Sequence, residues 1–123
     1  GRTIGVIPER LTNIEFLDHQ ADELFVVKDM RERKGKIEEL SDGFIALPGG
    51  IGTLEELFEI WVGRYLGFHK KPIAILDPAG AYDSLRVALR DLTEKNFMKP
   101  GQHEQVLWCS NIENALSHVA TVG

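Results

Sequence analysis

The sequence predicts an α/β protein with a doubly wound parallel sheet in three layers. Three observations support this fold class. Five short apolar runs rich in β-branched residues recur along the chain, amphipathic segments with helical spacing separate them, and each run is almost continuously apolar. Strands that are buried on both faces of a parallel sheet have this continuous apolar character. Regular alternation of strands and helices then implies right-handed βαβ units, with helices on both faces of the sheet.

The expected strands are the runs TIGVI (3–7), ELFVV (23–27), GFIAL (43–47), PIAIL (72–76) and QVLWC (105–109). The expected helices cover 30–40, 53–66, 82–95 and 110–120, with an irregular polar break at 96–104. The second helix has Leu57 and Trp61 at helical spacing, and Gly67 follows it as a C-cap. The last helix opens with Ser110 and Glu113, which have the spacing of a capping box.

The bulk composition indicates one soluble globular domain over 1–123. A chain of 123 residues suffices for one domain, and contents of 43% apolar and 27% charged residues are ordinary. The net charge of -5 argues against nucleic acid or an acidic membrane as a partner, and no apolar run approaches the roughly 20 residues of a membrane span. The single cysteine, Cys109, has no internal disulfide partner, so we expect a reducing, cytoplasmic location.

The segment LPGGIGTLEE (47–56) is the main candidate for a ligand site. Its glycines Gly49, Gly50 and Gly52 allow positive φ angles and close approach of a ligand to the backbone, whose N–H groups can hold an anion. A helix that begins near Thr53 adds a positive dipole end. The loop follows the strand 43–47, and ligands of doubly wound sheets bind at the carboxyl ends of the strands.

The pattern of this loop excludes the two common phosphate motifs. No GK[ST] follows the glycines, which disfavours an ATP-type loop, and the third glycine of the dinucleotide fingerprint is missing, which disfavours NAD. The alternative is that the glycines only make a tight turn, with Thr53 and Glu56 forming a capping box. In either case we expect Thr53 to cap the helix.

The segment MRERKGK (30–36) concentrates basic residues just after the strand 23–27. One interpretation is a solvated helix face. The other is that an arginine from this helix faces the glycine loop, where its guanidinium would bind phosphate or orient a carboxylate. The pattern alone leaves both open.

Other candidate residues carry less signal. The four histidines have no metal-ligand spacing, and no serine lies in a G-x-S-x-G elbow. Cys109 is expected to be a core residue. Trp61 fits the core-facing side of its helix, although it could also border a base pocket.

Together, MRERK (30–34) and PGGIGTLEE (48–56) resemble the paired M-x-x-R-K and P-G-G-x-G-T-x-x-E motifs of the LOG (lonely guy) family. These are cytokinin riboside 5′-monophosphate phosphoribohydrolases, often labelled lysine decarboxylases. The resemblance covers the whole chain, which is similar to the C-terminal two-thirds of the family. Members begin with another strand and glycine-rich loops. We therefore expect the chain to start inside the family's sequence, and its Rossmann-like sheet to lack the first strand–helix segments.

The resemblance implies an N-glycosidase that hydrolyses a purine or cytokinin nucleoside 5′-monophosphate, such as AMP or an N6-substituted AMP, to free base and ribose 5-phosphate. It implies a homodimer and no cofactor. By position the catalytic pair is Arg33 and Glu56, with Glu55 as the rival carboxylate. The implied substrate contacts are Glu15, Arg33, Lys34, Gly49, Gly50, Ile51, Gly52, Thr53, Leu54, Glu55 and Glu56. The alternative function is a non-catalytic nucleotide-binding or carrier module of the same fold. A lysine decarboxylase is disfavoured, because no lysine stands in a recognisable Schiff-base setting.

Overall fold

The computed structural model describes residues 4–8, 23–27 and 29–120, in two compact units that comprise 1–41 and 42–123. The first unit combines parallel strands with one helix and the second combines them with several, as the α/β prediction requires. Within the described residues, no helix has the length and apolar character needed to cross a membrane.

The first unit is a two-stranded parallel sheet and a helix. Strand β1 (Ile4–Pro8) pairs with β2 (Glu23–Val27), with Ile4 opposite Glu23, and helix α1 (Met30–Leu40) packs against both strands. The helix begins where it does because the Asp29 carboxylate accepts a hydrogen bond of 2.9 Å from the N–H of Glu32. The predicted boundaries of β2 and α1 are confirmed.

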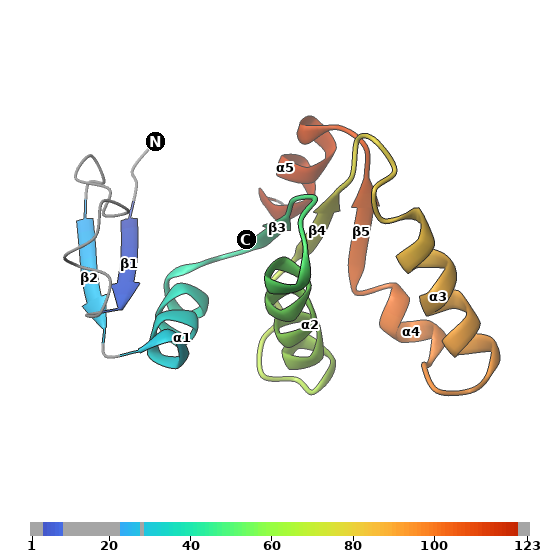
Figure 1. Cartoon of the computed structure of the whole chain (residues 1–123), viewed down its shortest axis with the longest axis horizontal. Coiled ribbons are helices and arrows are strands. Elements are labelled where there is room, and N and C mark those ends of the chain that lie inside the picture. The colour runs from blue at the N-terminus through green and yellow to red at the C-terminus, as the bar shows by residue number, and fades with distance from the viewer. Residues whose placement is uncertain (1–3, 9–22, 28, 121–123) are drawn as a thin grey trace. The chain divides into compact units, whose positions relative to one another are not determined.

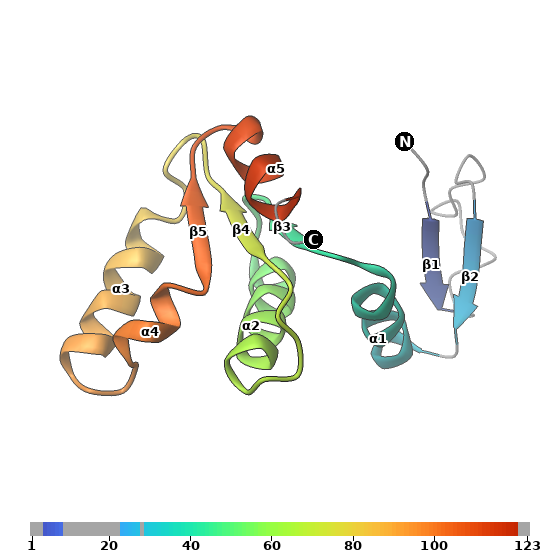
Figure 2. The same ribbon diagram turned by 180° about the vertical axis from the view of Figure 1, so that it is seen from behind.

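The second unit contains the other strands and helices. Its parallel sheet has the order β3 (Phe44–Ala46), β4 (Ile73–Leu76), β5 (Val106–Cys109), and its helices are α2 (Ile51–Tyr65), α3 (Asp83–Glu94), α4 (Pro100–His103) and α5 (Ile112–Ala120). Helices α2 and α3 lie on one face of the sheet and α5 lies on the other (Figures 1 and 2). The predicted arrangement in three layers is confirmed in this unit.

The alternation of side chains along β4 divides the core between the two faces. Ile73 and Ile75 are fully buried and pack with side chains from α2, α3 and β5. Ala74 points to the opposite face, which α5 covers and where Ala115 is also fully buried. The small residues at these two positions let the helix approach the sheet closely.

Trp61 is a core residue, as one interpretation expected, whereas Cys109 is only half-buried and lies outside the core cluster, so the expectation of a core cysteine is wrong. Trp61 is buried in the core, and its indole N–H donates a hydrogen bond of 2.9 Å to the carbonyl oxygen of Gln102. The thiol of Cys109 donates to the carbonyl oxygen of Ile75 at 3.5 Å, and burial raises the pKa of this thiol above its ordinary value. A protonated, partly buried thiol is a poor nucleophile.

The start of α2 differs from the prediction. The helix begins at Ile51 and its N-cap is Gly50, so Thr53 is the third helical residue and does not cap. The capping box between Thr53 and Glu56 is therefore wrong. The physical reason is that β3 ends at Ala46, so that only four residues separate the strand from the helix. The first intrahelical bond joins the Leu54 N–H to the Gly50 carbonyl at 3.1 Å, which places Thr53 inside the first turn.

The end of α2 follows the prediction closely. Gly67 has a φ of 86° and comes immediately after the C-cap, Leu66. The Gly67 N–H bonds to the Arg64 carbonyl at 3.1 Å and the Phe68 N–H to the Gly63 carbonyl at 2.9 Å. This is a Schellman motif, in which glycine avoids the strain of the left-handed conformation.

Two details near the C-terminus correct the prediction. Helix α5 is capped by Asn111, whose side-chain oxygen accepts from the Asn114 N–H at 2.8 Å, and Ser110 lies one residue too early to do this. The segment 96–104 is not wholly irregular, because Pro100 begins the short helix α4. Proline suits this first helical position, where its missing N–H costs nothing.

Replacing Trp61 with phenylalanine should lower the free energy of unfolding by about 2 kcal/mol, because the smaller ring leaves a cavity and the hydrogen bond to the Gln102 carbonyl is lost. Urea unfolding followed by circular dichroism measures this change. Val87→Ala is the control, because Val87 is 59% exposed and its replacement should change stability by no more than about 0.5 kcal/mol. An unchanged midpoint for Trp61→Phe would contradict the core role.

Candidate active site

The glycine loop lies at the carboxyl end of β3, as predicted. Residues 47–50 join β3 to α2 and are exposed to solvent (Figure 1). The candidate site therefore consists of a short turn followed by the first turn of α2, and the opposite side of α2 packs in the core.

The N-terminus of α2 has no side-chain cap. Its N-cap residue, Gly50, carries no side chain, and the first intrahelical donor is the N–H of Leu54. The N–H groups of Ile51, Gly52 and Thr53 therefore have no acceptor within the helix. Three orphan donors and the positive end of the helix dipole make this turn a site for an anion.

The loop glycines do not have positive φ angles. Among the described residues, the glycines with positive φ are Gly67 and Gly80, so this part of the expectation for Gly49, Gly50 and Gly52 is wrong. Another reason must account for glycine at these three positions.

The space around the loop gives two such reasons. A Cβ atom at Gly49 would collide with the side chain of Thr53, so the turn itself requires glycine there. A Cβ at Gly50 or Gly52 would meet no described atom within 4 Å. Glycine at 50 and 52 therefore leaves open surface directly over the orphan amides, as the close approach of a ligand requires.

Two glutamates lie on the side of α2 that faces away from its core. Glu55 and Glu56 are both exposed, whereas Leu57 and Trp61 on the same helix are buried. Residues four apart lie next to each other on a helix surface. Glu56 is therefore one turn below Gly52, and Glu55 is one turn below Ile51. Of the other loop residues, Thr53 and Leu54 are half-buried, and Leu54 packs against the core.

The basic residues of the predicted site belong to the other unit. Arg33 and Lys34 are half-buried residues of α1. Glu15 lies outside the described residues. The pairing of Arg33 with Glu56 stays a prediction.

Tyr82 is a residue of this region that the sequence pattern did not indicate. Its hydroxyl bonds to the backbone of Leu47 and Gly49, both at 2.8 Å. Tyr82 follows β4, so it comes from the same edge of the sheet as the loop. That placement is the one sequence signal that could have identified it.

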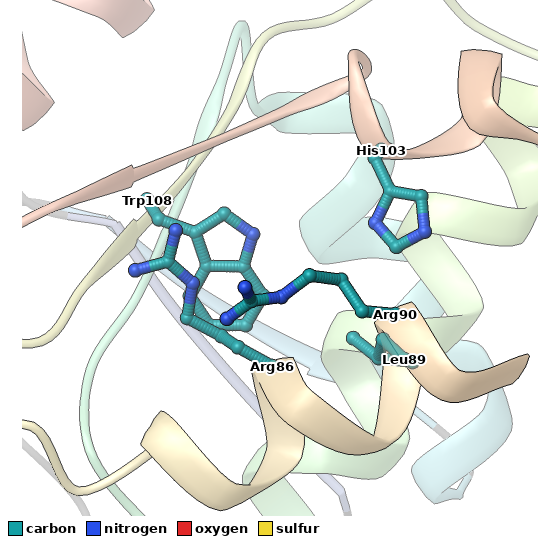
Figure 3. Close-up of a pocket in the computed structure, with 5 residues that line it drawn as sticks. All are labelled: Arg86, Leu89, Arg90, His103 and Trp108. Atoms are coloured by element: carbon teal, nitrogen blue, oxygen red, sulfur yellow. The ribbon is translucent and has the colours of Figure 1, made fainter. Parts of the chain in front are cut away.

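A pocket with a volume of about 290 Å³ lies elsewhere in the second unit (Figure 3). Its lining residues come from α3, α4 and β5 and are Arg86, Leu89, Arg90, His103 and Trp108. The Arg86 guanidinium stands 4.9 Å from the centroid of the Trp108 ring, which is a cation–π contact. None of the predicted site residues lines this pocket.

His69 and His103 bind neighbouring groups of the protein. His69 Nδ1 accepts from the Lys71 N–H at 3.0 Å, and its Nε2 donates to the Ile60 carbonyl at 2.8 Å. His103 Nε2 lies 2.6 Å from the Thr93 hydroxyl. In the described part of the chain, no three His, Cys, Asp or Glu side chains gather in a way that could hold a metal ion.

Comparison with known proteins identifies the family. Residues 1–119 match the model of a family described as "Possible lysine decarboxylase". The cytokinin riboside 5′-monophosphate phosphoribohydrolase of Mycobacterium tuberculosis is 47% identical over 116 residues, which are 94% of this chain and 62% of that protein. The enzyme of the same name from Mycobacterium marinum is 43% identical over 120 residues, 98% of this chain and 64% of that protein. LOG5 of Arabidopsis thaliana, which has the same enzyme name, is 41% identical over 102 residues, 83% of this chain and 45% of that protein.

The chain thus spans a little under two-thirds of the length of these bacterial relatives. Its glycine loop and basic helix both fall within the matched residues. The chain belongs to the LOG family, whose sequence model is described as possible lysine decarboxylases and whose curated members are cytokinin riboside 5′-monophosphate phosphoribohydrolases.

Proposed function

We propose that the protein hydrolyses the N-glycosidic bond of a purine or cytokinin nucleoside 5′-monophosphate. Water adds across the bond, so that the products are the free base and ribose 5-phosphate. The observation that carries the proposal is the uncapped start of α2, where the open face of Gly52 lies one turn above the exposed carboxylate of Glu56. The names of the relatives support this substrate class.

The phosphate would bind at the orphan amides of α2. The N–H groups of Gly52 and Thr53, together with that of the N-cap residue Gly50, can donate to its oxygens, and the helix dipole favours its negative charge. Because Gly50 and Gly52 have no side chains, the phosphate can reach the backbone without displacing protein atoms.

A carboxylate beside the phosphate suits the chemistry of the bond that breaks. Cleavage between ribose C1′ and the base nitrogen develops positive charge on the sugar ring, which a nearby carboxylate stabilises. The same carboxylate can take a proton from the attacking water. The substrate places its anion and its reacting carbon one ribose apart, and four helical residues advance the chain by about 6 Å.

We assign this role to Glu56 and keep Glu55 as the rival. Glu55 and Glu56 lie three and four residues beyond Gly52, so both are its neighbours on the helix surface, and both are exposed. The spacing of the family motif favours Glu56.

The residues of the first unit would complete the site. Arg33 would orient the Glu56 carboxylate and offset its repulsion from the phosphate, because a guanidinium binds carboxylates and phosphates in a planar, bidentate manner. Lys34 and Glu15 would contact the nucleotide. These roles rest on the match to the family motif.

The proposal includes a homodimer in the cytoplasm. Apolar side chains that are exposed along and after α2 support self-association, namely Val62 (52%), Leu66 (57%) and Phe68 (80%). The single cysteine supports a reducing compartment.

Glu56→Gln should lower kcat by about 10²- to 10⁴-fold, because the amide neither stabilises the sugar cation nor accepts a proton. Free base released from AMP and from N6-isopentenyl AMP, separated by chromatography, measures the rate. Glu55→Gln is the matched control and should stay within a few-fold of wild type. The reverse order of the two variants would assign the role to Glu55. AMP binding by the wild-type protein without base release would favour the non-catalytic nucleotide-binding module instead.

Gly52→Ala should change stability and activity in opposite directions. Alanine is the better helix former, so the free energy of unfolding should rise by up to about 1 kcal/mol. The added methyl group would stand where the phosphate approaches, so the KM for AMP should rise at least roughly tenfold, the loss expected when the reacting groups are displaced. Thermal melts and initial rates on the same preparation test both effects. A stabilised variant with an unchanged KM would place the phosphate elsewhere.

A further inference from the structure

The hydroxyl of Tyr82 bonds to Leu47 and to Gly49, at the start of the glycine loop. Its oxygen lies 2.8 Å from the carbonyl oxygen of Leu47 and 2.8 Å from the amide nitrogen of Gly49. A carbonyl oxygen only accepts and an amide N–H only donates, so the hydroxyl donates its proton to Leu47 and accepts from Gly49. The two bonds close a ring of defined geometry around Pro48.

Tyr82 is itself held by β4 and β5. Its side chain is 5% exposed, and its ring meets the Trp108 ring edge-on at a centroid distance of 6.5 Å. The N–H groups of Ala81 and Tyr82 donate to the Asp77 carboxylate at 2.8 and 2.9 Å. The N–H of Asp77 donates to the Cys109 carbonyl at 2.8 Å. The position of the hydroxyl is therefore set by the sheet and not by the loop.

The loop depends on this hydroxyl. In the described part of the chain, Leu47, Pro48 and Gly49 make no other recorded hydrogen bond to a different element. All three are exposed, and glycine has the widest backbone freedom of any residue. The core fixes the amides of α2, but among the described residues only Tyr82 is recorded holding the two peptides on either side of Pro48.

We propose that Tyr82 is a positioning residue for the nucleotide phosphate. Its hydroxyl holds the two peptides on either side of Pro48 and so fixes the backbone that runs into Gly49 and Gly50, so that the Gly50 N–H faces the phosphate together with the amides of α2. The hydroxyl has given its only proton to Leu47, so it cannot also donate to the phosphate, and it acts through the loop alone. This inference rests on the proposed function, which assigns the phosphate to this loop.

The variant Tyr82→Phe keeps the buried ring and removes only the hydroxyl. The KM for AMP should rise at least roughly tenfold, with a smaller change in kcat, because the loss falls on phosphate binding. Isothermal titration should show weaker binding of AMP and unchanged binding of adenosine, which has no phosphate. The melting temperature should fall by no more than about 5 °C, the shift expected for the loss of one hydrogen bond.

The matched control is Thr93→Val, which removes the hydroxyl of a residue near the C-terminal end of α3, the helix that begins just after Tyr82. The Thr93 hydroxyl joins the Leu89 carbonyl at 3.1 Å and His103 Nε2 at 2.6 Å, and it contacts no loop residue. Its loss should lower the melting temperature by a similar amount and leave the KM for AMP unchanged. Amide hydrogen exchange adds a direct measurement, in which the Gly49 N–H should lose protection in Tyr82→Phe only.

Equal KM and affinity for AMP in Tyr82→Phe and wild type would overturn the positioning role, whatever the change in melting temperature. Full protection of the Gly49 N–H in that variant would overturn it as well. A wild-type protein that binds AMP but releases no base would refute the proposed hydrolysis instead, and the AMP affinities of the two variants would still decide the role of Tyr82.

Discussion

The packing of α2 against β4 is the constraint on which the rest of the second unit depends. Leu57 and Trp61 bury one side of the helix against Ile73 and Ile75. A helix is stiff, so fixing its buried side also fixes the direction of its first turn. Core contacts several residues away thus set the direction of the free N–H groups at the start of α2. The geometry of the exposed loop therefore depends on the buried side of the helix.

The C-terminal half of the same helix is anchored in a different way. The Trp61 indole and the Arg64 guanidinium both donate to backbone carbonyls near the start of β5, at 2.9 Å to Gln102 and 2.8 Å to Gln105. Side-chain donors thus hold one end of α2, while the donors of its other end remain available to a ligand.

Local charge, and not the net charge, decides what the glycine loop can bind. The chain carries a net charge of -5, and two glutamates follow the loop directly. The field of a helix terminus acts within one turn, and exposed charges beyond about 10 Å are largely screened at 0.1 M salt. An acidic protein can therefore hold a phosphate, provided that the carboxylates lie one turn away from the amides and face the sugar.

The sequence predicted those features that arise from periodic burial. Strand 23–27 and helix 30–40 were located to the residue, and the position of the glycine loop followed from the rule for parallel sheets. Features that depend on a single hydrogen bond were harder to predict. Thr53 and Ser110 both belong to capping patterns, yet Gly50 and Asn111 begin their helices, because the preceding strand and turn decide where the chain first bends.

Contacts between distant residues left no local pattern at all. The bonds of Tyr82 to the loop span 33 and 35 residues, and no periodicity in the sequence points to them. The pocket beside Trp108 was also not predicted, although Arg86 and Arg90 have the spacing of neighbours on a helix. Such sites depend on which side chains meet in space, and the local patterns of a single sequence do not show those meetings.

The uncapped start of α2 has a consequence for the energetics of the whole unit. A serine, threonine, asparagine or aspartate at an N-cap typically contributes about 1 kcal/mol relative to alanine, and glycine contributes less than these residues. At Gly50 the chain forgoes about a few tenths of a kcal/mol of that contribution, while α1 and α5 are capped by Asp29 and Asn111. A phosphate bound at the three amides would supply the missing cap from solution. Nucleotide concentration would then add to the stability of α2, and the protein without nucleotide would lack this contribution at its glycine loop.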